Sequence, residues 1–203
     1  MKTKIALAIA ATLFTSASFA KDRVNLSESI DLSENAQVHF EVAVGSIQIE
    51  TYDGDTIKLD IEVKESDNDW FSSADLDDVE LKVRGDADDI SLEIDVEDVV
   101  QTWIVKLPKT ANIEIDLGVG EVEIEDFERS ASIDVGVGEV DIELASDNYR
   151  EIELESGVGG ADLDGFKGAD RERNIVNESI EWRGTGEYEI EIDVGVGDID
   201  VRD

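Results

Sequence analysis

The chain has 203 residues, one proline, no cysteine and a formal net charge of −35 at pH 7. Because DNA, RNA and anionic lipid headgroups are bound through Lys and Arg contacts to phosphate, a chain this acidic is not expected to bind them. Without cysteine there are no disulfides, thiolate metal sites or cysteine nucleophiles. Stability must therefore come from packing and backbone hydrogen bonds.

The first twenty residues have the pattern of a secretory signal peptide. Lys2 and Lys4 form a basic start, residues 5–14 are apolar, and Ser18-Phe19-Ala20 offers small residues at the two positions that a signal peptidase inspects. An apolar run of about ten residues is too short to cross a bilayer core of roughly 30 Å, so a retained anchor is the less favoured alternative. We expect residues 1–20 to be removed. The mature chain, residues 21–203, is then a single domain without a transmembrane segment, in the periplasm or outside the cell.

The first part of this domain, residues 21–107, contains alternating apolar runs separated by turn sequences, which is typical of antiparallel strands. Tyr52-Asp53-Gly54-Asp55 lies between two such runs, and an Asp-Gly pair in this position is a strong hairpin signal. Arg84-Gly85-Asp86 lies between two further runs. We therefore predict two hairpins within an antiparallel meander.

Residues 67–78 break the alternation and are predicted to form a long loop or a short helix. Trp70 and Phe71 stand side by side there, and exposed aromatic side chains could anchor a partner. The favoured alternative is that the loop folds back over an open end of the core. Asp67-Asn68-Asp69 begins like a calcium-binding EF-hand loop but lacks the glycine and the distal glutamate of that motif.

The second part of the domain, residues 108–203, contains a repeated Gly-Val-Gly tripeptide. The copies are 118–120, 136–138, 157–159 and 195–197, so their first glycines are 18, 21 and 38 residues apart. The last interval equals two steps of 19, which predicts a degenerate copy near Val176-Asn177-Glu178. An early relative is Ala43-Val44-Gly45.

Apolar residues alternate on both sides of each tripeptide, which indicates half-buried β-strands. The step from Val119 to Val122 is three residues and changes the parity of the alternation. A bend must absorb the extra residue, and glycine tolerates the backbone angles that a bend requires. We predict that Val119 and Val122 both face inward across this bend. A phosphate-binding loop is disfavoured, because a strand rather than a helix follows each copy and acids surround it.

One such unit cannot bury its own apolar face, whereas stacked units share a continuous core. The predicted fold is therefore all-β: a stacked-strand solenoid, β-helix-like, with an N-terminal antiparallel meander.

Three segments in the second half support a family resemblance. Val105-Lys106-Leu107-Pro108-Lys109, then Ile113-Glu114-Ile115, then residues 118–124 resemble β-strand repeat proteins described as putative adhesins of unknown function, also called toastrack domains. That family shows a V-x-L-P strand ending followed by G-x-G-[acid or Ser]-V bends. Phe166-Lys167-Gly168 is similar to its inter-repeat L-x-G, whereas residues 127–130 lack that glycine. The resemblance implies a right-handed β-solenoid-like stack and an envelope or surface role, and it supplies no catalytic residues.

No catalytic site is expected. His39 is the only histidine, and its neighbours in the alternation place it on the outward face as a solvated side chain. With one imidazole, a histidine-based metal site is not expected either. Paired carboxylates could hydrolyse glycosides, but such sites usually also collect aromatic side chains, and Trp70, Trp103 and Trp182 are scattered along the chain.

Alignment of the repeats on their glycines superposes acidic residues. Rungs that stack in register would bring consecutive carboxylates to roughly 5 Å, where like charges repel unless salt screens them or cations bridge them. Calcium prefers such oxygen ligands, although the chain lacks a dedicated calcium motif. We expect a solvated acidic face, with diffuse calcium or magnesium binding as the alternative and no other cofactor. The superposed residues are Asp116, Asp134, Glu155 and Asp193 in one set, and Glu123, Asp141, Asp162 and Asp200 in another.

The sequence predicts a non-catalytic exported interaction or scaffold protein, adhesin-like or envelope-associated, whose partner is an envelope protein or a glycan. The alternative is a divalent-cation-binding or envelope-stress sensing module.

Overall fold

The structure is a computed structural model that describes residues 23–66 and 76–203, and the expected signal peptide lies outside these ranges. Thirteen strands form one continuous hydrogen-bonded sheet, and a short 3₁₀ helix covers Leu76–Asp78. The described residues contain no α-helix. The strands are β1 (Arg23–Asp31), β2 (Gln37–Tyr52), β3 (Thr56–Glu65), β4 (Lys82–Gly85), β5 (Asp89–Glu93), β6 (Val99–Pro108), β7 (Asn112–Phe127), β8 (Ala131–Leu144), β9 (Tyr149–Val158), β10 (Ala161–Leu163), β11 (Asp170–Arg173), β12 (Glu178–Arg183) and β13 (Tyr188–Arg202).

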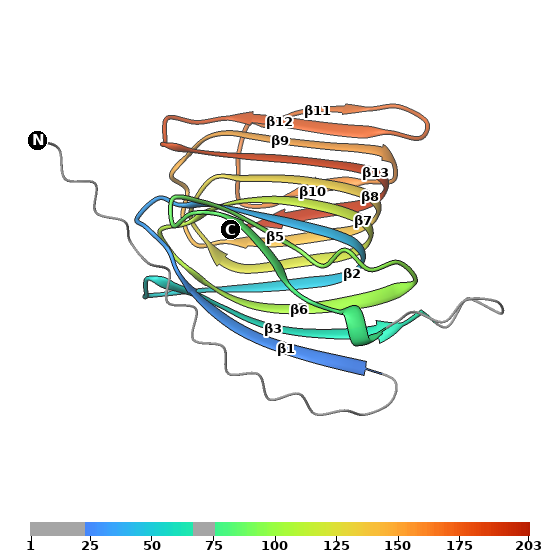
Figure 1. Cartoon of the computed structure of the whole chain (residues 1–203). Helices are drawn as coiled ribbons and strands as arrows, with labels where there is room; N and C mark the ends of the chain where they lie inside the picture. The colour runs from blue at the N-terminus through green and yellow to red at the C-terminus, as the bar shows by residue number, and fades with distance from the viewer. Residues whose placement is uncertain (1–22, 67–75) are drawn as a thin grey trace, which may run out of the picture.

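Strands β2, β7, β8 and β13 each bend at a glycine corner, so each contributes to two layers. The first layer contains the halves before the corner, in the order β4-β5-β2-β7-β8-β13-β9-β12-β11. The second layer contains the halves after it, in the order β1-β3-β6-β2-β7-β8-β13-β10. Figure 1 shows these strands stacked from β1 at the bottom to β11 and β12 at the top. The all-β stacked-strand prediction is confirmed.

The bent strands run parallel and in register through the corner. Val44 pairs with Val119, Val119 with Val137, and Val137 with Val196. Before the corner, Ile113, Ile115 and Leu117 of β7 are buried, and after it Val122 and Ile124 are buried. The apolar sides of both layers therefore face one shared core.

The corner valine points outward, contrary to the sequence prediction. Val119 is 47% exposed, whereas Val122 is fully buried. The buried side chains instead continue from Leu117 directly to Val122. This step is five residues, an odd number, so it accounts for the change of parity. The parity change falls within the corner, where the chain turns beside Gly120: this glycine has a φ of +150°, and a Cβ added to it would overlap the Gly45 carbonyl of the neighbouring rung.

The order of the rungs in space differs from their order in the chain. Strand β13, at the C-terminus, lies between β8 and the β9–β10 rung. The degenerate repeat predicted near Val176-Asn177-Glu178 does not form a corner. Residues 170–183 instead form the antiparallel β11–β12 hairpin, which closes where the Asn174 N–H donates to the carbonyl of Asn177 at 3.0 Å. The carbonyl of Val176 accepts a hydrogen bond from Gly159 at 3.1 Å, so this hairpin covers the last corner.

The N-terminal strands extend the two layers. Strands β1, β3 and β6 pair antiparallel, and β4 and β5 form the hairpin predicted at Arg84–Asp86. The hairpin predicted at Tyr52–Asp55 is wrong, because β6 lies between β2 and β3. Strand β2 pairs in parallel with β5, β6 and β7 and is the first rung of the stack.

Candidate functional site

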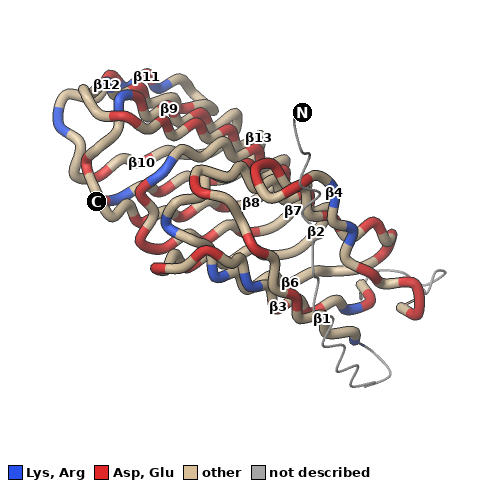
Figure 2. Tube along the Cα trace, turned by 60° about the vertical axis from the view of Figure 1, so that its left-hand side comes forward, with Lys and Arg blue, Asp and Glu red and all other residues tan. Residues whose placement is uncertain are grey.

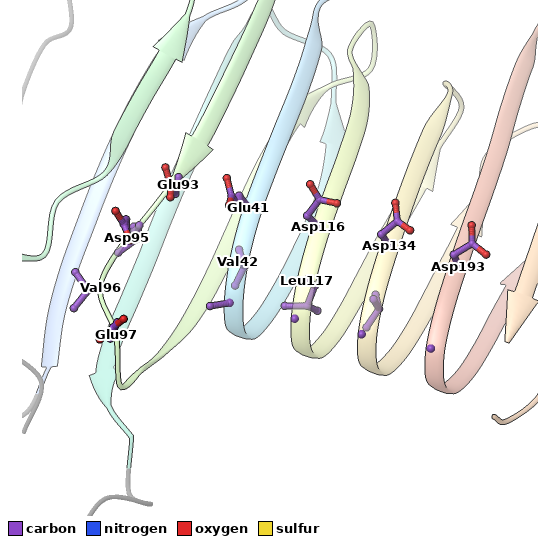
Figure 3. Close-up of a pocket in the computed structure, with 16 residues that line it drawn as sticks. Glu41, Val42, Glu93, Asp95, Val96, Glu97, Asp116, Leu117, Asp134 and Asp193 are labelled. Atoms are coloured by element: carbon purple, nitrogen blue, oxygen red, sulfur yellow. The ribbon is translucent and has the colours of Figure 1, made fainter. Parts of the chain in front are cut away.

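The outer face of the first layer carries a column of acidic side chains. The strand alternation that buries Ile115 and Leu117 turns Asp116 outward between them, and register pairing repeats this on each rung. Figure 3 shows five of these carboxylates on the same side of adjacent strands. We call the set the first-layer acid column: Glu93, Glu41, Asp116, Asp134, Asp193 and Glu155.

A second column lies on the outer face of the second layer. It consists of Glu123, Asp141, Asp200 and Asp162 and is called the second-layer acid column. The structure therefore brings each superposed set of acids into one column. Within each column the acid from β13 is next to last rather than last, because β13 is inserted into the stack. Figure 2 shows Asp and Glu recurring along successive strands.

The two columns differ in how their charge is compensated. In the second-layer acid column, Arg202 lies 3.5 Å from Asp141 and 3.6 Å from Asp200, and Arg171 lies 2.9 Å from Asp162. The Gln48 amide also donates to Glu123 at 2.8 Å. Two arginines therefore compensate part of the charge of the four carboxylates in the second-layer acid column, and Arg202 also lies 3.8 Å from Glu143.

The first-layer acid column keeps most of its negative charge. Arg84 pairs with Glu93 at 2.8 Å, and His39 lies 2.8 Å from Asp116. Among the residues that the structure describes, no Lys or Arg pairs with Asp134 or Asp193. Burial raises the pKa of the Asp193 carboxyl, and the charges of its neighbours in the column raise it further.

A groove of about 630 Å³ follows this column where the first layer meets the corner. One wall is formed by the segment after β5, which carries Asp95 and Glu97 (Figure 3). All members of the column except Glu155 line the groove, and Gly118, Gly136 and Gly195 leave backbone at its surface because they have no side chain. A groove rich in carboxylate oxygens is suited to cations and to partners that present ammonium, guanidinium or hydroxyl groups.

The corner itself presents a second surface, an apolar one. The outward valines of five rungs form a continuous row, which we call the valine ridge: Val44, Val119, Val137, Val196 and Val158, each between 38% and 50% exposed. These side chains were expected in the core from the alternation of apolar residues, and that prediction is wrong. The glycine on either side of the valine was the available signal that this position lies in the turn rather than on the inner face.

His39 faces outward, as predicted, beside two acids of β7. Its Nε2 lies 2.8 Å from Asp116 Oδ2 and its Nδ1 lies 4.0 Å from Glu114 Oε1. This cluster does not emerge from an alignment of the later repeats alone, because His39 lies on the first rung. Superposing Ala43-Val44-Gly45 on residues 118–120 would have placed His39 opposite Glu114.

The proposed aromatic anchor, Trp70 and Phe71, lies outside the described residues, as does the EF-hand-like start at residues 67–69. Within residues 23–66 and 76–203, the structure contains no helix with the length and apolar character needed to span a membrane.

Comparisons with known proteins add a family match. The family model described as the N-terminal domain of toast_rack, DUF2154, matches residues 16–164. A search of curated proteins finds no match to this chain.

The solved structures that match the chain have low sequence identity to it. A putative cell adhesion protein from Clostridium sporogenes is 16% identical with a TM-score of 0.48, and the match covers 88% of this chain and 99% of that one. A putative adhesin from Bacteroides fragilis is 14% identical with a TM-score of 0.34, covering 87% and 96% of the two chains.

Proposed function

Because this chain belongs to the toast_rack family through its N-terminal domain, we propose that it is a non-catalytic, exported interaction or scaffold module of the cell envelope, adhesin-like in character. Its partner is an envelope protein or a glycan. Export rests on the signal-peptide pattern of residues 1–20 and is tested by the N-terminal mass of the chain recovered outside the cytoplasm, which we expect to begin at Lys21.

The observation that carries this proposal is the difference between the two acid columns. A solvated acidic face that served only solubility would need no groove and would be neutralised to a similar extent throughout. The first-layer acid column instead keeps unpaired carboxylates along a groove of about 630 Å³. Regular spacing from rung to rung favours a partner that is itself extended and repeats its contacts.

A charge-neutralised variant tests the proposal. Asp116→Asn, Asp134→Asn and Asp193→Asn combined remove three charges from the first-layer acid column. The matched control, Glu123→Gln, Asp141→Asn and Asp200→Asn, removes three from the second-layer acid column. We expect a partner captured from envelope extract by the unaltered chain to be lost with the first variant and in high salt, and to be kept by the control. Equal capture by both variants would contradict the proposal.

A second candidate function is divalent-cation binding that senses the state of the envelope. The unneutralised in-register carboxylates of the first-layer acid column favour it, because calcium takes six to eight oxygen ligands. Melting curves at low salt test it. A rise in Tm with calcium beyond that given by sodium at matched ionic strength supports the candidate, and an equal rise with the two salts refutes it.

A further inference from the structure

A cluster of three potential metal ligands lies where β2 and β7 run side by side in the first layer. It consists of His39, the only histidine of the chain, with Glu114 and Asp116. One ligand atom from each side chain lies within 4.8 Å of the other two. Because one ligand is an imidazole, this cluster differs chemically from every other position in the acid columns.

The register of the two strands holds the three residues together. His39 pairs directly with Glu114, and Asp116 is the next outward residue along β7. Their strand neighbours Val38, Phe40 and Ile115 are buried in the core with at most traces of exposed surface. The backbone positions of all three ligands are therefore set by packing rather than by a loop.

The donor set favours a transition metal over calcium or magnesium. Imidazole nitrogen suits zinc, copper, nickel and iron, whereas calcium and magnesium prefer sites built from oxygen alone. Two carboxylates also balance the charge of a divalent ion. In the described part of the chain, His39 is the only basic side chain paired with Glu114 or Asp116, so no Lys or Arg competes with a bound cation.

The geometry needs little adjustment to hold an ion. Zinc bonds of about 2.0 to 2.2 Å place tetrahedral ligand atoms about 3.3 to 3.6 Å apart. The present separations run from 2.8 Å between His39 and Asp116 up to 4.8 Å across the cluster. Glu114 is about half exposed and has a long side chain, so rotation of that side chain closes the gap without backbone movement.

We propose that His39, Glu114 and Asp116 form a surface site for one divalent transition metal such as zinc, with water in the remaining coordination position. This proposal goes beyond the proposed envelope role and does not depend on it. It is also distinct from diffuse calcium binding along the acid columns, because its selectivity comes from a nitrogen ligand.

Zinc titration calorimetry tests the site, with the full-length chain purified without a polyhistidine tag. Excess calcium is present throughout to occupy sites made of carboxylates alone. We expect one equivalent of zinc to bind, and His39→Gln and Asp116→Asn each to weaken binding at least about ten-fold. The matched control is Asp141→Asn, which removes one carboxylate from the second-layer acid column and leaves zinc affinity unchanged.

A second readout uses the unaltered protein and so does not depend on how the variants fold. The single imidazole gives one set of NMR resonances, which we expect to shift as one equivalent of zinc is added. Unchanged imidazole resonances at saturating zinc, or equal zinc affinity in the His39→Gln variant, would overturn the proposal. So would displacement of the bound zinc by the excess calcium.

Discussion

Replacing Gly120 by alanine tests the corner that joins the two layers. Gly120 has a φ of +150°, a region that residues with a Cβ rarely adopt. An added Cβ would lie 2.8 Å from the carbonyl carbon of Gly45 and closer still to its oxygen. Because both atoms belong to the backbone of the neighbouring rung, no side-chain rotation relieves the overlap, and β2 and β7 must separate locally.

The expected cost is the sum of two effects. Backbone strain contributes about 1 to 3 kcal/mol and overpacking about 1 to 3 kcal/mol, so the free energy of unfolding falls by about 2 to 6 kcal/mol. For a domain of this size each kcal/mol lowers the Tm by about 2 to 4 °C. Thermal unfolding followed by far-ultraviolet circular dichroism should therefore show a Tm lower by about 4 to 24 °C.

Gly168→Ala is the matched control, because Gly168 has a φ of +86° but an added Cβ there meets nothing within 4 Å. This variant carries the backbone cost alone, about 1 to 2 kcal/mol. If Gly120→Ala melts at the same temperature as the unaltered chain, or above Gly168→Ala, the tight stacking of the corners is refuted.

Two further substitutions test the electrostatics. The charge of Asp141 is the largest cause that raises the pKa of the Glu139 carboxyl. The folded chain therefore binds a proton at Glu139 more tightly than the unfolded chain does. The free energy of unfolding consequently falls as the pH rises from the ordinary pKa of Glu139 to its raised value. Above the raised pKa, Glu139→Gln should therefore increase the free energy of unfolding by less than about 1 kcal/mol after salt screening. Below the ordinary pKa of Glu139 the substitution should give no such increase. Urea unfolding at several pH values measures the difference. Glu178 is 2% exposed, pairs with Arg171 at 3.2 Å and accepts a hydrogen bond from Ala161. Glu178→Ala should lower the free energy of unfolding by about 1 to 3 kcal/mol in the same assay, and a change near zero would show that this carboxylate does not hold the β11–β12 hairpin to β10.

The stacked architecture and the acid columns could be predicted because repetition carries positional information. Where each rung has its glycines at the same place, residues at equal offsets become neighbours in register. Aligning Gly118, Gly136 and Gly195 was therefore enough to place Asp116, Asp134 and Asp193 side by side.

The order of the rungs could not be predicted from the same repetition. Repeats with nearly the same alternation of apolar and polar residues form strands with similar edges. The sequence alone therefore does not determine which two strands pair. The segment between β10 and β13 forms the β11–β12 hairpin and is long enough for β13 to enter the stack beside β8. The insertion of β6 between β2 and β3 could not be predicted either. A short Asp-Gly turn predicts that the chain changes direction after β2, but it does not predict which strand pairs with β2.

The orientation of the corner valine was missed for a local reason. A change of parity between Leu117 and Val122 can be accommodated with Val119 on either side of the turn. The close approach of the adjacent rung at Gly120 belongs to the stacked arrangement, and that contact is not visible within one repeat.

Cysteine accessibility is the most direct test of the claim that the corners turn valine outward while both flanking strands face one core. The chain has no cysteine, so single variants report on one position each. A maleimide should label Val119→Cys rapidly in the native protein, and should label Leu117→Cys and Val122→Cys only after denaturant is added. Protection of Val119→Cys, or rapid native labelling of Leu117→Cys, would contradict the account.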